Sequence, residues 1–119
     1  MTGIAELLTR AKSRIREITP RQVAGQLGKI TVVDVREPEE FTAGHLPGAI
    51  NIPRGLLEFR VDAHPILCDR NCTIVMQCQS GRRSALATVA MQEMGYTNVV
   101  NMAGGFTAWK TANLPVEKP

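Results

Sequence analysis

A cysteine at the start of a short polar loop has the clearest chemical potential in this sequence. Cys78 follows an apolar run, residues 73–77, and precedes a helix-like run, residues 84–94. A loop that ends a buried strand and opens a helix directs backbone N–H groups and the positive helix end toward one point. A thiolate is favoured there, so Cys78 is a candidate nucleophile. The residues that would surround a small anionic substrate are Gln79, Ser80, Gly81, Arg82, Arg83 and Ser84.

The competing interpretation of Cys78 is a packed core cysteine, because free cysteines are among the most buried residues in proteins. Three neighbours argue against a purely structural role. Gly81 suits a backbone that must curve tightly, and Arg82 and Arg83 add positive charge at the far end of the loop. We therefore expect a reactive cysteine that meets an anion.

Composition narrows the classes of protein to consider. A length of 119 residues suits one domain with one core. The chain has no apolar run of membrane-spanning length and no hydrophobic leader, so we expect neither a membrane span nor a secretory signal. Three cysteines do not make a disulfide framework, and a working thiolate is most simply kept in a reducing cytoplasm.

Charge is distributed unevenly along the chain. The whole net charge of +3 lies in residues 1–21, and the rest of the chain sums to zero. Residues 3–17 have apolar side chains at helical spacing, which predicts an amphipathic basic helix within residues 1–18. We expect this helix to dock on its own domain, with a homodimer contact or an anionic membrane surface as the alternatives. No basic and aromatic cluster marks the remainder, so we expect no nucleic-acid partner.

Strands and helices alternate through the remaining chain. We predict strands at 30–35, 49–53, 73–77 and 98–102. We predict helices at 20–27, 38–44, 55–61, 82–94 and 104–111. This alternation is typical of a parallel sheet covered on both faces. Ligands bind at the carboxyl ends of such strands, which is where Cys78 lies.

Three blocks of sequence resemble the rhodanese domain, in order and with normal spacing. They span residues 30–115, nearly all of the chain outside the N-terminal helix. The first runs Val33-Asp34-Val35-Arg36-Glu37-Pro38-Glu39-Glu40-Phe41 and continues from Gly44 to Pro53; the second is Cys78-Gln79-Ser80-Gly81-Arg82-Arg83-Ser84; the third is Ala103-Gly104-Gly105-Phe106-Thr107-Ala108-Trp109.

The resemblance implies an α/β fold with a five-stranded, mainly parallel sheet flanked by helices. It divides the chain into the N-terminal helix at 1–18, a rhodanese domain at 19–115 and a loose tail at 116–119. It implies a sulfurtransferase that needs no cofactor. Cys78 would take sulfur from an anionic donor such as thiosulfate, become a persulfide, and pass the sulfur to cyanide, a thiol or a protein.

The resemblance also implies supporting residues at the rim of the site. Asp34 would face the loop and could pair with Arg83, or it could only shape the rim. Arg36 is expected to form a structural pair with Glu37 or Glu40.

Two other functions compete with the enzyme. In the first, the same persulfide would serve a carrier module that delivers sulfur to one partner protein docked at residues 1–18. In the second, the chain would be a cysteine phosphatase, but such enzymes place arginine six residues after the cysteine, where this chain has Ser84. We expect no metal site either, because His64, Cys68 and Cys72 supply only three ligands and no Cys-x2-Cys pair.

Overall fold

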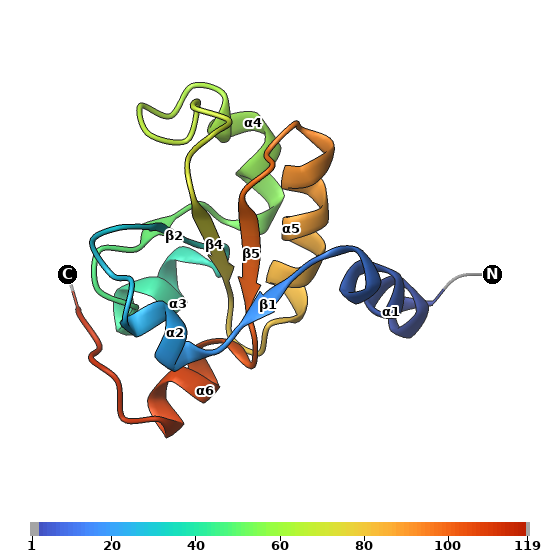
Figure 1. Ribbon diagram of the computed structural model, residues 1–119. Helices are drawn as coiled ribbons and strands as arrows, with labels where there is room; N and C mark the ends of the chain where they lie inside the picture. The colour runs from blue at the N-terminus through green and yellow to red at the C-terminus, as the bar shows by residue number, and fades with distance from the viewer. Residues whose placement is uncertain (1–2, 119) are drawn as a thin grey trace.

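The computed structural model describes residues 3–118 and shows a five-stranded sheet between two layers of helices (Figure 1). All neighbouring strands run parallel, in the order β1-β5-β4-β2-β3. The strands are β1 (Glu17–Ile18), β2 (Thr31–Asp34), β3 (Ile50–Asn51), β4 (Ile74–Gln77) and β5 (Val99–Met102).

Helices connect the strands and cover both faces of the sheet. They are α1 (Ile4–Arg14), α2 (Pro20–Ala24), α3 (Pro38–Ala43), the short 3-10 helix η1 (Arg54–Leu56), α4 (Leu57–Val61), α5 (Arg82–Glu93) and α6 (Gly105–Thr111). Capping residues in the sequence mark the beginning of two of these helices. A capping box between Thr19 and Gln22 begins α2, and Glu37 with Glu40 begins α3.

Two hydrophobic clusters hold the layers together because successive strand residues point to opposite faces. In β4, Ile74 and Met76 join the cluster under α4 and α5, whereas Val75 joins the cluster under α2 and α6. Cys78 follows Ile74 and Met76 at the same two-residue spacing, so its side chain lies on the face covered by α5. This alternation of side chains thus places the thiol at the N-terminal end of α5.

The four strands expected from sequence are present, and the fifth lies in a segment that we had predicted to be helical. The N-terminal helix ends at Arg14 rather than at residue 17, and Glu17 and Ile18 pair with β5. Backbone bonds flank this pairing: Asn101 N donates to Arg16 O at 3.0 Å, and Ala103 N donates to Ile18 O at 2.9 Å. Residues 17 and 18 are therefore part of the sheet.

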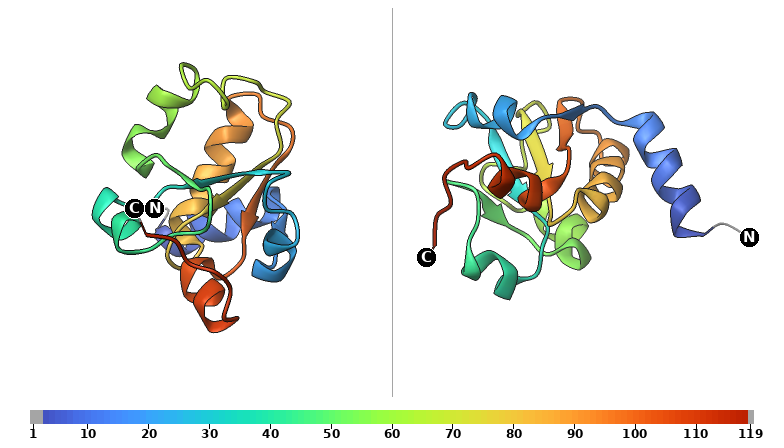
Figure 2. Two further views of the ribbon diagram at one scale, coloured as in Figure 1. Left: turned by 90° about the vertical axis from the view of Figure 1, so that its left-hand side faces the viewer. Right: turned by 90° about the horizontal axis from the view of Figure 1, so that it is seen from below.

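Helix α1 packs against α5 and extends from the body of the domain in two views (Figures 1 and 2). Ala11 is its one fully buried side chain among the described residues, while Leu8 and Ile15 are half-buried. Ile4 remains 54% exposed and Leu7 42% exposed. The expected docking on the domain is thus confirmed for the middle of the helix, but its first turn stays largely in solvent.

The C-terminal tail is held more firmly than expected. Glu117 forms an antiparallel bridge with His45, with both backbone N–H···O distances at 2.9 Å. The Glu117 carboxylate also accepts a bond from Gly48 N at 2.8 Å. The prediction of a loose tail is therefore wrong at Glu117. No helix among residues 3–118 combines the length and apolar character needed to cross a membrane.

Candidate active site

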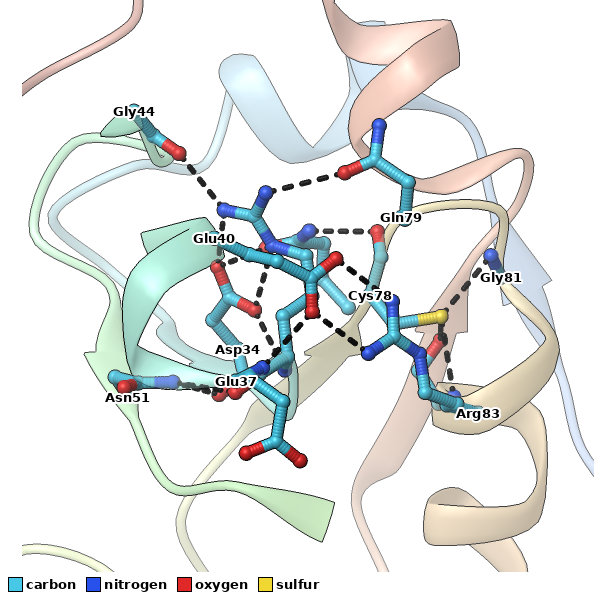
Figure 3. Close-up of polar contacts among 12 residues, drawn as sticks. Asp34, Glu37, Glu40, Gly44, Asn51, Cys78, Gln79, Gly81 and Arg83 are labelled. Atoms are coloured by element: carbon cyan, nitrogen blue, oxygen red, sulfur yellow. Dashed lines mark hydrogen bonds and ion pairs between the residues drawn. The ribbon is translucent and has the colours of Figure 1, made fainter. Parts of the chain in front are cut away.

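Three hydrogen-bond donors converge on the sulfur of Cys78. Gly81 N lies 3.1 Å from Sγ (Figure 3). Both the backbone N and the Oγ of Ser84 lie 3.3 Å from Sγ. The cysteine side chain is fully buried at the N-terminal end of α5. N–H donors and a helix N-terminus both favour negative charge, so this arrangement suits a thiolate.

The loop keeps this shape because Gly81 adopts a left-handed conformation. Its φ of +91° is one that residues with side chains rarely adopt, and an added Cβ would lie 3.3 Å from Gly104 N. The Gly81 carbonyl accepts a bond from Asn101 Nδ2 at 3.1 Å, and the same amide donates to Glu17 Oε2 at 2.8 Å. Asn101 is fully buried in β5, so it links the N-terminal strand to the loop.

Helix α6 fixes the other end of the loop. Phe106 N donates to Cys78 O at 2.8 Å, and Thr107 N donates to Gln79 O at 3.1 Å. The helix approaches so closely that a Cβ on Gly105 would lie 2.5 Å from Cys78 O. With these two carbonyls bound by α6, the loop's N–H groups remain free to face the sulfur.

A buried arginine ties the rim together. Arg36 is 2% exposed and forms an ion pair with Asp34, with 2.8 Å between Nη2 and Oδ2. Its guanidinium also donates to Gly44 O at 2.8 Å and to Gln79 Oε1 at 3.2 Å, and it lies over the Phe106 ring. The partner of Arg36 is therefore Asp34, and the expected pairing with Glu37 or Glu40 is wrong. The fold can bury this ion pair because nearly every polar group of the two side chains has a hydrogen-bond partner.

Arg83 pairs with Glu40 on α3 rather than with Asp34, which corrects the second expected contact (Figure 3). Two bonds of 2.9 and 3.1 Å join the side chains. The hydrogen bond from Arg83 lowers the pKa of Glu40 from 4.5 to about 2, and the carboxylate in turn raises the pKa of Arg83. The charge of Arg83 is thus partly neutralised beside the site.

The remaining loop residues point away from the sulfur. The side chain of Gln79 bridges Arg36 and Thr107, which is a scaffolding position. Ser80 and Arg82 are exposed and face α1 across a hollow. The structure therefore brings Cys78, Gly81 and Ser84 together, with Arg83 held nearby through Glu40.

Sequence reasoning missed Glu40, Asn101 and Gly105 as parts of the site. Glu40 is 43 positions from Arg83, and Asn101 is 20 positions from Gly81, so no local spacing connects them. A signal was available for Gly105, because two consecutive glycines after a buried strand indicate a close backbone approach.

Cys68 and Cys72 lie before β4, at the opposite end of that strand from Cys78. Burial raises the pKa of the Cys72 thiol, which favours its neutral form. All three cysteines are free. These two cysteines are thus separate from the loop that surrounds Sγ.

Comparisons with known proteins agree with this architecture. The chain is 39% identical over 97 residues to the protein named thiosulfate sulfurtransferase 16 of Arabidopsis thaliana, covering 71% of this chain and 78% of that protein. It is 33% identical over 90 residues to a protein named sulfurtransferase of Allochromatium vinosum, covering 76% and 80%.

A solved structure from Rhodopseudomonas palustris, described as a protein of unknown function and possible tyrosine phosphatase, superposes with a TM-score of 0.91. It has 34% identity and covers 98% of this chain and 96% of its own. Its coverage includes α1. The sequence profile of the rhodanese-like domain matches residues 19–112, which contain the loop and most of the residues that support it. The chain therefore belongs to the rhodanese-like domain family.

Proposed function

We propose that the protein is a sulfurtransferase that carries sulfur as a persulfide on Cys78. The observation that carries this proposal is the convergence of Gly81 N, Ser84 N and Ser84 Oγ on Sγ. These donors stabilise the attacking thiolate and the thiolate that leaves after sulfur is passed on. Sulfurtransferase names among the relatives support the same reaction class.

The reaction divides into two displacements. In the first, the Cys78 thiolate attacks the outer sulfur of thiosulfate, the S–S bond of the donor breaks, and sulfite leaves with the electron pair. In the second, an acceptor such as cyanide attacks the outer sulfur of the persulfide, and Cys78 leaves as a thiolate. Neither displacement needs a redox cofactor. A reducing cytoplasm, which keeps free thiols available, suits this chemistry.

Arg82 and Arg83 have separate tasks in this scheme. Arg82 is exposed and attracts the anionic donor through its charge. Arg83 is tied to Glu40, so it orients one wall of the site more than it adds net charge.

The phosphatase alternative is weaker because of the loop length. Ser84 occupies the position six residues after Cys78, where a phosphatase has arginine. Both its backbone N–H and its hydroxyl donate hydrogen bonds to Sγ. A loop already closed on a single sulfur atom leaves little room for a phosphate group.

The test is mass spectrometry after incubation with thiosulfate. The peptide that contains Cys78 should gain the mass of one sulfur atom, and a reductant should remove it. Cys78→Ser should abolish both the gain and thiocyanate formation, whereas Cys68→Ser should preserve them. Hydrolysis of an aryl phosphate without any sulfur loading would reject the proposal in favour of the phosphatase.

A further inference from the structure

The C-terminal tail closes back onto the domain in a segment that we call the strap, residues 115–117. After α6 the chain turns back toward the end of α3 (Figure 2). The strap is fixed at its start, because Trp109 Nε1 donates to Pro115 O at 2.7 Å. At its end, Glu117 forms two backbone bonds of 2.9 Å with His45. The strap therefore ties the last helix to the segment that follows α3.

The segment under the strap, residues 44–48, is held at two further points. Gly48 N donates to the Glu117 carboxylate at 2.8 Å. Gly44 lies close beneath the strap, since a Cβ built on it would lie 3.0 Å from Val116 Cγ1. Together with the two backbone bonds, these contacts fix the position of the Gly44 carbonyl.

One peptide unit connects the strap to the rim of the active site. The N–H of His45 donates to Glu117 O at 2.9 Å. The C=O of the same peptide belongs to Gly44, and it accepts a bond from Arg36 Nη2 at 2.8 Å. A peptide unit is planar and rigid, so holding its N–H also sets the direction of its C=O. The strap therefore orients the acceptor that Arg36 binds.

Arg36 in turn holds the first residue of the loop after the cysteine. Asp34 binds its guanidinium along one edge, through Nε and Nη2, and Gly44 O binds Nη2 as well. These two partners set the direction of Nη1, which donates to Gln79 Oε1 at 3.2 Å. One buried side chain thus joins Gly44 to Gln79, both of which Figure 3 labels.

We propose that Glu117 is a positioning residue for sulfur transfer, and that it acts through the Gly44 peptide and Arg36. The inference rests on the proposed function, because it assigns a residue to the same loop. Glu117 is exposed and lies outside the loop around Sγ, so it influences the reaction only through other residues. Its task is to keep Gln79, and with it the peptide that follows Cys78, in place. The matched family domain ends at residue 112, so the strap lies beyond it.

The first test breaks the end of the strap. Glu117→Pro lacks the N–H that donates to His45 O and the carboxylate that binds Gly48 N. The rate of sulfur loading at saturating thiosulfate should fall about three- to tenfold, because the loop is displaced. The half-saturating thiosulfate concentration should stay the same, since Arg82 still attracts the donor. Lys118→Pro is the matched control: it adds the same ring, and Lys118 N donates no backbone hydrogen bond among residues 3–118, so the loading rate should not change.

The second test asks whether the effect passes through Gln79. Gln79→Ala removes the acceptor that Arg36 Nη1 binds, so this variant should load more slowly than the wild type. If the strap acts along this path, adding Glu117→Pro to Gln79→Ala should slow loading by less than about twofold, because the connection is already broken. Two effects that multiply, as those of independent sites do, would overturn the proposal.

The third test needs no chemistry, so it separates this proposal from the proposed function. The side-chain amide of Gln79 bonds to Arg36 and to Thr107, and its NMR signals report both contacts. Glu117→Pro should shift these signals, whereas Lys118→Pro should leave them in place. If the wild type loads no sulfur, the proposed function fails, but this comparison still decides whether the strap holds the loop.

Two results would reject the strap as a positioning device. Unchanged loading in Glu117→Pro would mean that the strap secures only the tail. Slower loading with unshifted Gln79 signals would mean that the effect takes another path. If Glu117→Pro does not fold, Glu117→Ala takes its place, because it keeps the backbone bonds and loses only the bond from Gly48. It should slow loading about twofold and shift the same signals, and the same two results would reject the proposal.

Discussion

Asn101 controls the active-site loop from beneath it, although it does not touch the sulfur. Its amide donates to Gly81 O at 3.1 Å, and Gly81 N donates to Sγ at 3.1 Å. Among residues 3–118 the Asn101 Oδ1 has no hydrogen-bond partner, so the side chain acts through the two bonds that its amide nitrogen donates. Its role is to position the Gly81 peptide.

Asn101→Leu should therefore slow the loading of sulfur from thiosulfate by about tenfold or more, because small displacements of a donor are costly to a reaction. It should also destabilise the fold by about 1–3 kcal/mol, since the buried Gly81 carbonyl loses a partner. Mass spectrometry over time measures the loading, and urea unfolding measures the stability. Glu17→Gln is the control, because an amide oxygen can still accept the bond from Asn101. Unchanged loading in Asn101→Leu would show that the loop holds its own shape.

Glu40 is the residue whose ionisation links pH to stability. Its pKa is lowered from 4.5 to about 2 by the hydrogen bond from Arg83. The folded state therefore favours the carboxylate, so the pair stabilises the fold above about pH 4.5. That stabilisation is lost as the pH falls from 4.5 toward 2.

Glu40→Gln should remove this acid sensitivity. Because the Glu40 side chain is 33% exposed and its partner 40%, solvent screens the pair, and we expect a difference of at most about 1 kcal/mol. The measurement is the urea unfolding free energy of wild type and variant at neutral pH and near pH 2, with Glu39→Gln as the exposed control. A wild type that loses no more stability in acid than Glu40→Gln would rule out the electrostatic role.

At the residue scale, the sequence predicted the site residues that are consecutive in the chain. It missed the contacts between residues that are distant in sequence and meet only in the folded protein. The loop from Cys78 to Ser84 was identified because its residues are consecutive and sit between a strand and a helix. The prediction for Arg83 was wrong because Asp34 ends β2 and Glu40 follows soon after it. The sequence alone does not show which of the two carboxylates lies beside Arg83. Buried amides such as Asn101 have no distinctive spacing at all.

At the scale of elements, α6 acts as a clamp on the loop. Its first N–H groups bind the carbonyls of Cys78 and Gln79, and Gly105, at φ +61°, allows the helix to come that close. The clamp thus holds the first two peptides of the loop, whereas the donors to Sγ come from Gly81 and Ser84 farther along it.

Gly105→Ala should break this contact. The added methyl would lie 2.5 Å from Cys78 O and 2.6 Å from Gln79 O, so either the loop or the helix has to move. We expect destabilisation of about 1–3 kcal/mol and a large loss of sulfur loading. Gly55→Ala is the matched control, because no atom of the described residues lies within 4 Å of its added Cβ. Normal loading in a folded Gly105→Ala protein would mean that α6 does not shape the site.

The sequence around each element, more than its length, decided which strands could be predicted. Strands β2, β4 and β5 are four residues each and lie in apolar runs, so composition revealed them. Strand β1 has two residues, and its pattern merges with the periodicity of the preceding helix. Only pairing with β5 distinguishes Glu17 and Ile18 from the end of a helix.

At the scale of the whole molecule, the N-terminal segment has two parts with different tasks. Helix α1 forms the outer wall of the hollow beside the loop. Residues 16–18 complete the sheet and, through Glu17, support Asn101. Because the matched family domain begins at residue 19, the family boundary separates this strand from the sheet to which it belongs.

Two shortened chains should separate these tasks. A chain that begins at Ile15 lacks α1 but keeps β1, so it should load sulfur from thiosulfate at close to the full-length rate. It should melt at a somewhat lower temperature, because α5 loses the cover of Ala11 and Leu8. A chain that begins at Thr19 also loses the backbone partners of Asn101 and Ala103, together with the carboxylate that binds Asn101. It should unfold at a markedly lower temperature and load sulfur more slowly even where it is folded. Calorimetry and timed mass spectrometry on both chains give the comparison. If the Thr19 chain loads as fast as the Ile15 chain at a temperature where both are folded, β1 has no influence on the loop, and the link through Glu17 and Asn101 is structural only.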